Sequence, residues 1–198
     1  MTIEELNGII ASGGFDEFVR VCEARQTKAL ARIADEVAAR KSVRLLLLAG
    51  ASSAGKTTTA KRLCTQLRVN GLEAWHMSTD DYFVGDARNP RDENGERDYE
   101  TIGAVDADRL AQDLNALMSG RPVCVRRFNF RAHEGFDEER PTTLAPGCCL
   151  VLEGIHALNP LLTKGVEDAV KYRLFIDPTN QPEIFVHTRL PSSDARLI

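Results

Sequence analysis

An eight-residue segment has the residue types and spacing of a phosphate-binding loop. Residues 50–57 read Gly-Ala-Ser-Ser-Ala-Gly-Lys-Thr, which fits the pattern GxxxxGK[ST]. Glycines let such a loop curl around phosphates, and its N–H groups attract anions together with a helix N-terminus. Lys56 is expected to reach the β- and γ-phosphates, and the Thr57 hydroxyl to bind Mg²⁺. The predicted nucleotide-binding residues are Gly50, Ser52, Ser53, Ala54, Gly55, Lys56, Thr57 and Thr58.

Carboxylates follow two other apolar segments. Asp80 and Asp81 come after the run 74–77, where a kinase needs a carboxylate to orient and deprotonate an acceptor hydroxyl. Alternatively they cap a turn or a helix, and position alone does not decide between the two interpretations. Glu153 ends the run 150–152, as a Walker B acid does, and would help to hold Mg²⁺. Its alternative is a glutamate in a solvated turn.

Two charged clusters allow more than one interpretation. The segment 80–100 has eight Asp or Glu and three Arg, which usually means a solvated loop. The sharper hypothesis is a substrate loop whose carboxylates bind sugar hydroxyls. Further along, arginines lie beside Phe128 and Phe130, a combination that would suit base stacking in nucleic acids. This cluster is short and acids follow at 134–139, so no nucleic-acid partner is expected.

Composition limits the class of protein. The 198 residues carry 25 Lys+Arg and 29 Asp+Glu, a formal net charge of −4, which argues against nucleic-acid binding. A chain of this length can bury a core without a disulfide or metal staple. The five cysteines include no CxxC pair, and reduced thiols predict a cytoplasmic protein. No segment resembles a signal peptide or a membrane span, so no membrane partner is expected.

The elements that must position these residues follow from the apolar pattern. Short apolar runs predict strands at 43–49, 74–77, 123–127, 148–152 and 172–176, and helical spacing predicts helices at 56–70 and 106–118. This alternation predicts an α/β fold with a mostly parallel sheet flanked by helices. Ligands bind beyond the carboxyl ends of parallel strands, so Asp80 and Asp81 are expected to face the γ-phosphate. Residues 1–40 are a predicted helical extension, with a capping box at Thr2 and Glu5, and 41–198 a P-loop core.

Taken together, four segments in this order resemble the uridine kinase/phosphoribulokinase family. They are the phosphate loop at 50–58, Ser-Thr-Asp-Asp-Tyr-Phe at 78–83, Phe-Asn-Phe at 128–130 with His133, and Leu-Glu-Gly-Ile at 152–155. The resemblance covers roughly 43–198. It extends to bacterial nucleoside kinases whose kinase domain follows a threonyl-tRNA-synthetase-like region. It implies a P-loop NTPase fold of the nucleoside-kinase type.

The resemblance also implies roles for single residues. Asp80 corresponds to the catalytic carboxylate that takes the proton from a nucleoside 5′-hydroxyl. The other predicted catalytic residue is Lys56 of the phosphate loop. Glu100 corresponds to the acid that holds the ribose hydroxyls, and Glu153 to the metal-associated acid. Positions near the substrate or its base are matched by Tyr82, Phe83, Phe128 and His133.

The chain departs from the family pattern at two places. Phe128 and Asn129 stand where the family usually has a tyrosine and a carboxylate. The lid arginines of the family are expected just after residue 198, so the chain is interpreted as a core that ends before or within the lid. Whether the protein forms a homo-oligomer is left open.

The predicted reaction is transfer of the γ-phosphoryl group of ATP, with Mg²⁺, to a hydroxyl of a small molecule. A uridine- or cytidine-like nucleoside is the favoured acceptor. One alternative is another small hydroxyl compound, such as a sugar phosphate or a pantothenate-like acid. The other is a nucleotide-binding regulatory module without turnover.

Overall fold

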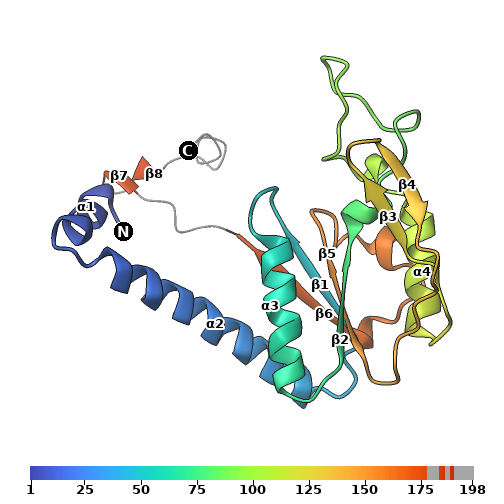
Figure 1. The fold of residues 1–198 in the computed structure, drawn as a ribbon, viewed down its shortest axis with the longest axis horizontal. Coiled ribbons are helices and arrows are strands. Elements are labelled where there is room, and N and C mark those ends of the chain that lie inside the picture. Colours follow the sequence, from blue (N-terminus) through green and yellow to red (C-terminus); the bar gives the residue numbers. More distant parts are fainter. Residues whose placement is uncertain (178–182, 186–187, 190–198) are drawn as a thin grey trace.

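The computed structural model describes residues 1–177 and the backbone of residues 183–185 and 188–189 (Figure 1). The predicted end of the core before or within a lid lies outside the described residues. The two short C-terminal strands, β7 (Glu183–Phe185) and β8 (Thr188–Arg189), pair antiparallel with each other.

Four parallel strands form the central sheet. Its order is β2 (Ala74–Ser78), β5 (Cys149–Glu153), β1 (Leu45–Gly50) and β6 (Lys171–Ile176). In the register of the sheet, Glu153 lies beside Leu48 of β1 on one side and Ser78 of β2 on the other. The C-terminal ends of these three strands therefore meet at one edge. The predicted α/β fold with a parallel sheet is confirmed.

Helices cover both faces of this sheet (Figure 1). On one face α3 (Lys56–Val69) and the C-terminal part of α2 (Phe15–Ala39) pack against Leu46 and Leu48 of β1. On the other face α4 (Ala107–Met118) packs into the core that contains Leu45 and Leu47. Successive side chains of a strand point to opposite faces, so a strand that is buried on both needs an unbroken apolar run.

Two helices form the N-terminal region, α1 (Ile3–Ala11) and α2. The predicted capping box is confirmed, since the N–H of Glu5 donates to Thr2 Oγ1 at 3.1 Å and the N–H of Thr2 to the Glu5 carboxylate at 2.8 Å. The N-terminal half of α2 is mostly exposed, Val21 and Cys22 included. Burial in α2 is confined to Leu30, Ala34 and Val37. The division at residue 40 stays a prediction.

A separate hairpin lies beside the sheet. β3 (Arg126–Asn129) pairs antiparallel with β4 (Glu134–Asp137). The strand predicted at 123–127 is wrong in its bounds, because within this run only a single bridge, between Val123 and Thr142, precedes β3. β4 reads Glu-Gly-Phe-Asp, residue types that are mostly depleted in strands, and the apolar pattern therefore missed it.

Short 3₁₀ helices complete the described fold: η1 (Thr79–Tyr82), η2 (Ile102–Ala104), η3 (Pro160–Thr163) and η4 (Asp168–Val170). All five cysteines are free, and Cys148 and Cys149 are buried. In the described part of the chain, no helix is both long and apolar enough to cross a bilayer.

Candidate active site

The segment 50–57 connects the end of β1 to the start of α3. Gly55 and Ser53 have φ angles of 79° and 59°, which turn the chain sharply before the helix begins. Gly50 is required for another reason, since a Cβ there would lie 2.5 Å from the backbone oxygen of Ile176 on β6. The first N–H groups of α3 have no intrahelical acceptor. The loop therefore provides a cradle of donors that suits a phosphate group.

Lys56 is the first residue of α3 and is half-buried. Its Nζ donates to the backbone oxygen of Ala51 at 2.8 Å, which holds the ammonium group over the loop. Among the other predicted nucleotide-binding residues, Ser52 and Ala54 are half-buried, and Ser53 and Thr58 are exposed. All of them lie in this loop or in the first turn of the helix.

Thr57 and Glu153 meet although 96 positions separate them. The Thr57 hydroxyl donates to Glu153 Oε1 at 2.8 Å, and Glu153 is only 2% exposed. Burial opposes ionisation of Glu153, but contacts with His76, Thr57 and Ser78 outweigh it and lower the pKa of the carboxyl. Hydroxyl and carboxylate oxygens suit Mg²⁺, which usually completes its shell with phosphate and water. In residues 1–177, no group of three or more His, Cys, Asp or Glu could hold a metal.

Asp80 lies in η1, directly after β2. The cap of this short helix is Ser78, whose Oγ accepts the N–H of Asp80 at 3.2 Å. The Asp80 carboxylate is therefore not used as a cap, and it accepts from the Thr79 hydroxyl at 3.3 Å. Burial raises the pKa of Asp80, the charge of Glu153 raises it further, and Lys56 and Thr79 act in the opposite direction. A raised carboxyl pKa in a cleft is a feature of general bases.

A cavity of about 200 Å³ is lined both by Asp80 and by residues of the phosphate-binding loop, but not by Thr57 or Glu153. Five residues of the predicted site lie in its wall: Ser52, Lys56, Asp80, Phe83 and Glu100. Tyr99, Phe130 and Ile155 also line it, and none of them was among the predicted site residues. Two carboxylates, an ammonium group and three aromatic rings thus share one small cavity. A signal for the missed residues existed, because Tyr99 precedes Glu100 and Phe130 closes the Phe-Asn-Phe segment.

The aromatic rings of this cavity are packed on one another. The Phe83 ring lies 4.9 Å from Tyr99 and 6.1 Å from Phe130, between centroids. Phe128 is buried behind them, 5.7 Å from Phe83. His133 Nδ1 is 2.9 Å from the Tyr99 hydroxyl. Phe128 and His133 therefore support the residues of the wall and do not themselves line the cavity.

Tyr82 lies away from the cavity, contrary to its predicted place beside the substrate. Its side chain is fully buried, and its hydroxyl donates to Asp113 of α4 at 3.0 Å. The resemblance in sequence placed it with Phe83, but the turn of η1 points neighbouring residues in different directions. Tyr82 is a core residue that anchors the segment carrying Asp80.

Some residues of the two charged clusters only stabilise their own surroundings, and others reach the cavity. Asp86 pairs with Arg91 and Arg97, so part of the acidic segment only stabilises its own loop. Asp80 and Glu100, at the two ends of the segment, reach the cavity. Arg127 of the hairpin is held by Asp81 and Glu138. A guanidinium group that is paired twice is a poor candidate for binding nucleic-acid phosphates.

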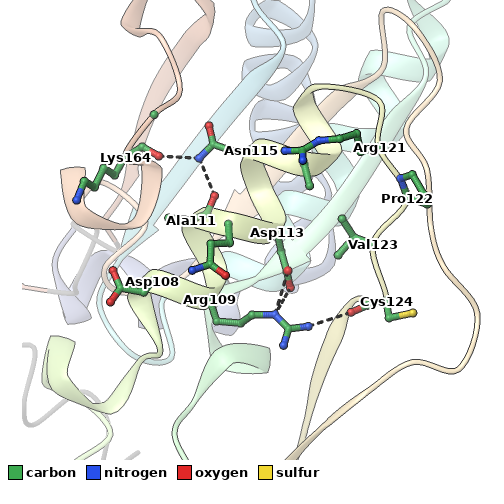
Figure 2. A pocket seen from close by; sticks show the side chains of 13 residues that line it. Asp108, Arg109, Ala111, Asp113, Asn115, Arg121, Pro122, Val123, Cys124 and Lys164 are labelled. Atoms are coloured by element: carbon green, nitrogen blue, oxygen red, sulfur yellow. Dashed lines mark hydrogen bonds and ion pairs between the residues drawn. The ribbon is translucent and has the colours of Figure 1, made fainter.

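A larger hollow of about 800 Å³ lies over α4 (Figure 2). Arg109, Asp113 and Asn115 are among its lining residues, and none of the predicted site residues is. Figure 2 shows that two of the polar side chains of its wall are already bonded within the protein, Arg109 to Asp113 and Asn115 to the Lys164 carbonyl. The candidate site is therefore the smaller cavity, where the carboxylates and the phosphate loop meet.

One glycine sets the spacing between the two carboxylate segments. A Cβ at Gly154 would lie 1.8 Å from Thr79 Oγ1, and Thr79 is fully buried. We expect Gly154→Ala to push η1 away from β5 and to lower the free energy of unfolding by about 1–3 kcal/mol. Denaturant unfolding measures this. Gly85→Ala is the matched control, since its Cβ would meet only the His133 carbonyl, at 3.8 Å. Equal losses in both variants would contradict the prediction.

Comparisons with known proteins agree on one protein family. The model of the phosphoribulokinase / uridine kinase family matches residues 45–188. A uridine kinase of Deinococcus deserti is 28% identical over 130 residues, which cover 66% of this chain and 59% of that protein. A uridine kinase of Vibrio atlanticus is 32% identical over 120 residues, covering 59% and 55%. The chain thus matches a little over half of the length of these relatives.

A solved structure shares the fold. The protein described as a possible uridine kinase from Bacillus stearothermophilus superposes with a TM-score of 0.55 at 20% identity. The match covers 67% of this chain and 70% of that one. The predicted P-loop kinase fold is confirmed, whereas the similarity to kinases with a threonyl-tRNA-synthetase-like region stays a prediction.

Proposed function

Because this chain belongs to the phosphoribulokinase / uridine kinase family, we propose that it transfers the γ-phosphoryl group of ATP to a hydroxyl of a small molecule. The observation that carries the proposal is that Lys56 and Asp80 line the same cavity. A phosphate-binding cation and a half-buried carboxylate then face one reaction space. The predicted cytoplasmic location and the homo-oligomer stay predictions.

Each residue of the site has a part in this proposal. The loop amides and Lys56 hold the β- and γ-phosphates, and Thr57 and Glu153 would hold Mg²⁺, which neutralises phosphate charge when it is bound. Asp80 orients the acceptor hydroxyl and accepts its proton. The protein contributes mainly position and electrostatic stabilisation.

A nucleoside fits the remaining groups of the cavity. The carboxylate of Glu100 suits ribose hydroxyls, and the rings of Phe83, Tyr99 and Phe130 suit the flat face of a base. The departure at Asn129 does not weaken this proposal, because its Oδ1 accepts the N–H groups of Arg131 and Ala132 and closes the turn of the hairpin. The named relatives are uridine kinases, which supports a uridine- or cytidine-like acceptor.

The test is ATP consumption with a panel of nucleosides, sugar phosphates and pantothenate, together with nucleotide binding by calorimetry. Transfer to uridine or cytidine supports the nucleoside proposal. Transfer only to another hydroxyl compound would mean that the protein is a kinase whose acceptor is not a nucleoside. ATP binding without transfer to any acceptor would contradict the proposal and favour a regulatory module.

The raised pKa of Asp80 predicts a pH effect. The Thr79 hydroxyl favours the ionised carboxylate by donating to it, so Thr79→Val should raise the pKa of Asp80 further. The base would then lose its proton only at higher pH, and the acid limb of the profile of kcat/KM should move upward. Thr163→Val, at another buried threonine, is the control. An unmoved acid limb, or one that moves downward, would contradict Asp80 as the titrating base.

A further inference from the structure

An ion pair joins the segment of Asp80 to the hairpin behind the aromatic wall. Arg127 donates from one terminal nitrogen to Asp81 Oδ2 at 2.8 Å and from Nε to Glu138 Oε1 at 2.7 Å. Asp81 is the next residue after Asp80, and Arg127 precedes Phe128 on β3. Arg127 therefore lies on the strand that supports the aromatic rings, and its guanidinium group contacts Asp81, the residue next to the proposed base Asp80.

This contact matters because the hydrogen bonding within η1 is weak. It has four residues, and the hydrogen bond from the N–H of Phe83 to the oxygen of Asp80 is long, 3.4 Å. Short 3₁₀ helices have poor hydrogen-bond geometry. Ser78 and Thr79 hold Asp80 from the N-terminal side, and on the other side the direction of its carboxylate depends on the side chains that follow it in the chain. Those are Asp81, held by Arg127, and Tyr82, held by Asp113.

The two anchors differ in what they attach. Asp113 is buried, and both of its carboxylate oxygens accept from Arg109 Nε of the same helix, at 3.0 and 3.1 Å (the contact is drawn in Figure 2). That anchor fastens η1 to the core. The Asp81–Arg127 pair is partly shielded, with side chains 20% and 36% exposed, and it fastens η1 to the hairpin. A planar guanidinium can bridge two carboxylates in a fixed geometry, which an ammonium cannot.

We propose that Arg127 is a positioning residue, which sets the orientation of Asp80 through Asp81 and couples it to the hairpin that supports the acceptor pocket. The inference rests on the proposed kinase function. Its consequence is that a displaced hairpin displaces the base. The coupling would make phosphoryl transfer depend on a properly filled acceptor pocket.

The test compares Arg127→Gln with Glu138→Gln. Arg127→Gln removes both ion pairs of the guanidinium group, whereas Glu138→Gln removes only the one with Glu138, so only the first variant releases Asp81. We expect Arg127→Gln to lower kcat by about 10- to 100-fold, as small displacements of reacting groups do, with nucleotide affinity nearly unchanged. Glu138→Gln should keep kcat close to that of the wild type. Arg127→Lys, which keeps the charge but not the fork, should recover only part of the loss.

A second readout does not need activity. Hydrogen exchange of a peptide covering 79–83 should become faster in Arg127→Gln and stay unchanged in Glu138→Gln. Equal exchange in the wild type and Arg127→Gln would overturn the inference, and so would equal losses of kcat in both variants. If the wild type transfers phosphate to no acceptor, the proposed function fails, and the exchange comparison still decides whether Arg127 holds η1.

Discussion

Asp80→Asn is expected to reduce phosphoryl transfer by roughly 10²–10⁴, the range for a positioned general base, and to leave ATP affinity nearly intact. An amide has almost the shape of the carboxylate and can still accept from the Thr79 hydroxyl, but it cannot take a proton from the acceptor. Transfer rates at saturating ATP and acceptor measure the effect. Glu93→Gln, an exposed acid of the same segment, is the control.

The same substitution should not destabilise the protein. Burial and the nearby charge of Glu153 raise the pKa of Asp80, so folding disfavours its ionised form. For a carboxyl whose pKa is raised on folding, stability is lost as the pH rises through that pKa. Replacing the charge by an amide removes this cost, and the Tm at neutral pH should stay the same or rise. Normal turnover would remove Asp80 from its role, and a lowered Tm would mean that its charge supports the fold.

Most of the sheet could be predicted from the sequence because a strand that is buried on both faces has a continuous apolar run. Leu45 to Leu48 are apolar without interruption since both faces of β1 are covered. The hairpin has no such apolar run, because β4 has exposed residues at three of its four positions. Its two strands are held by pairing with each other and by ion pairs of Arg127, one of them with Asp81, which lies 46 positions earlier in the chain.

The candidate site shows the same division. Thr57 and Glu153 could be brought together from the motif and the strand ends alone, because parallel strands end at a common edge. Tyr82 could not be separated from Phe83 by sequence, since the direction of each side chain follows from the turn of η1 and from Asp113 on a different helix. The departure at Asn129 likewise became interpretable only when its turn was seen.

Lys56→Ala is expected to weaken nucleotide binding or turnover by on the order of 10²–10³, the effect of removing one preorganised donor from developing charge. The ammonium group already lies over the loop, fixed by the carbonyl of Ala51, so the binding of phosphate needs little rearrangement of this side chain. Its charge also lowers the pKa of Asp80. Removing Lys56 should therefore raise that pKa and move the acid limb of any residual activity to higher pH.

The control for Lys56 lies on the same helix. Lys61 is exposed on α3, and Lys61→Ala removes an equal charge without changing the loop. Calorimetry with ATP separates the loss of affinity from the loss of turnover. Lys56→Arg should also be impaired, because the longer planar guanidinium cannot occupy the position of a compact ammonium beside Ala51. Wild-type affinity and turnover in Lys56→Ala would refute the assignment of residues 50–57 as the phosphate-binding loop, and with it the site built around Asp80.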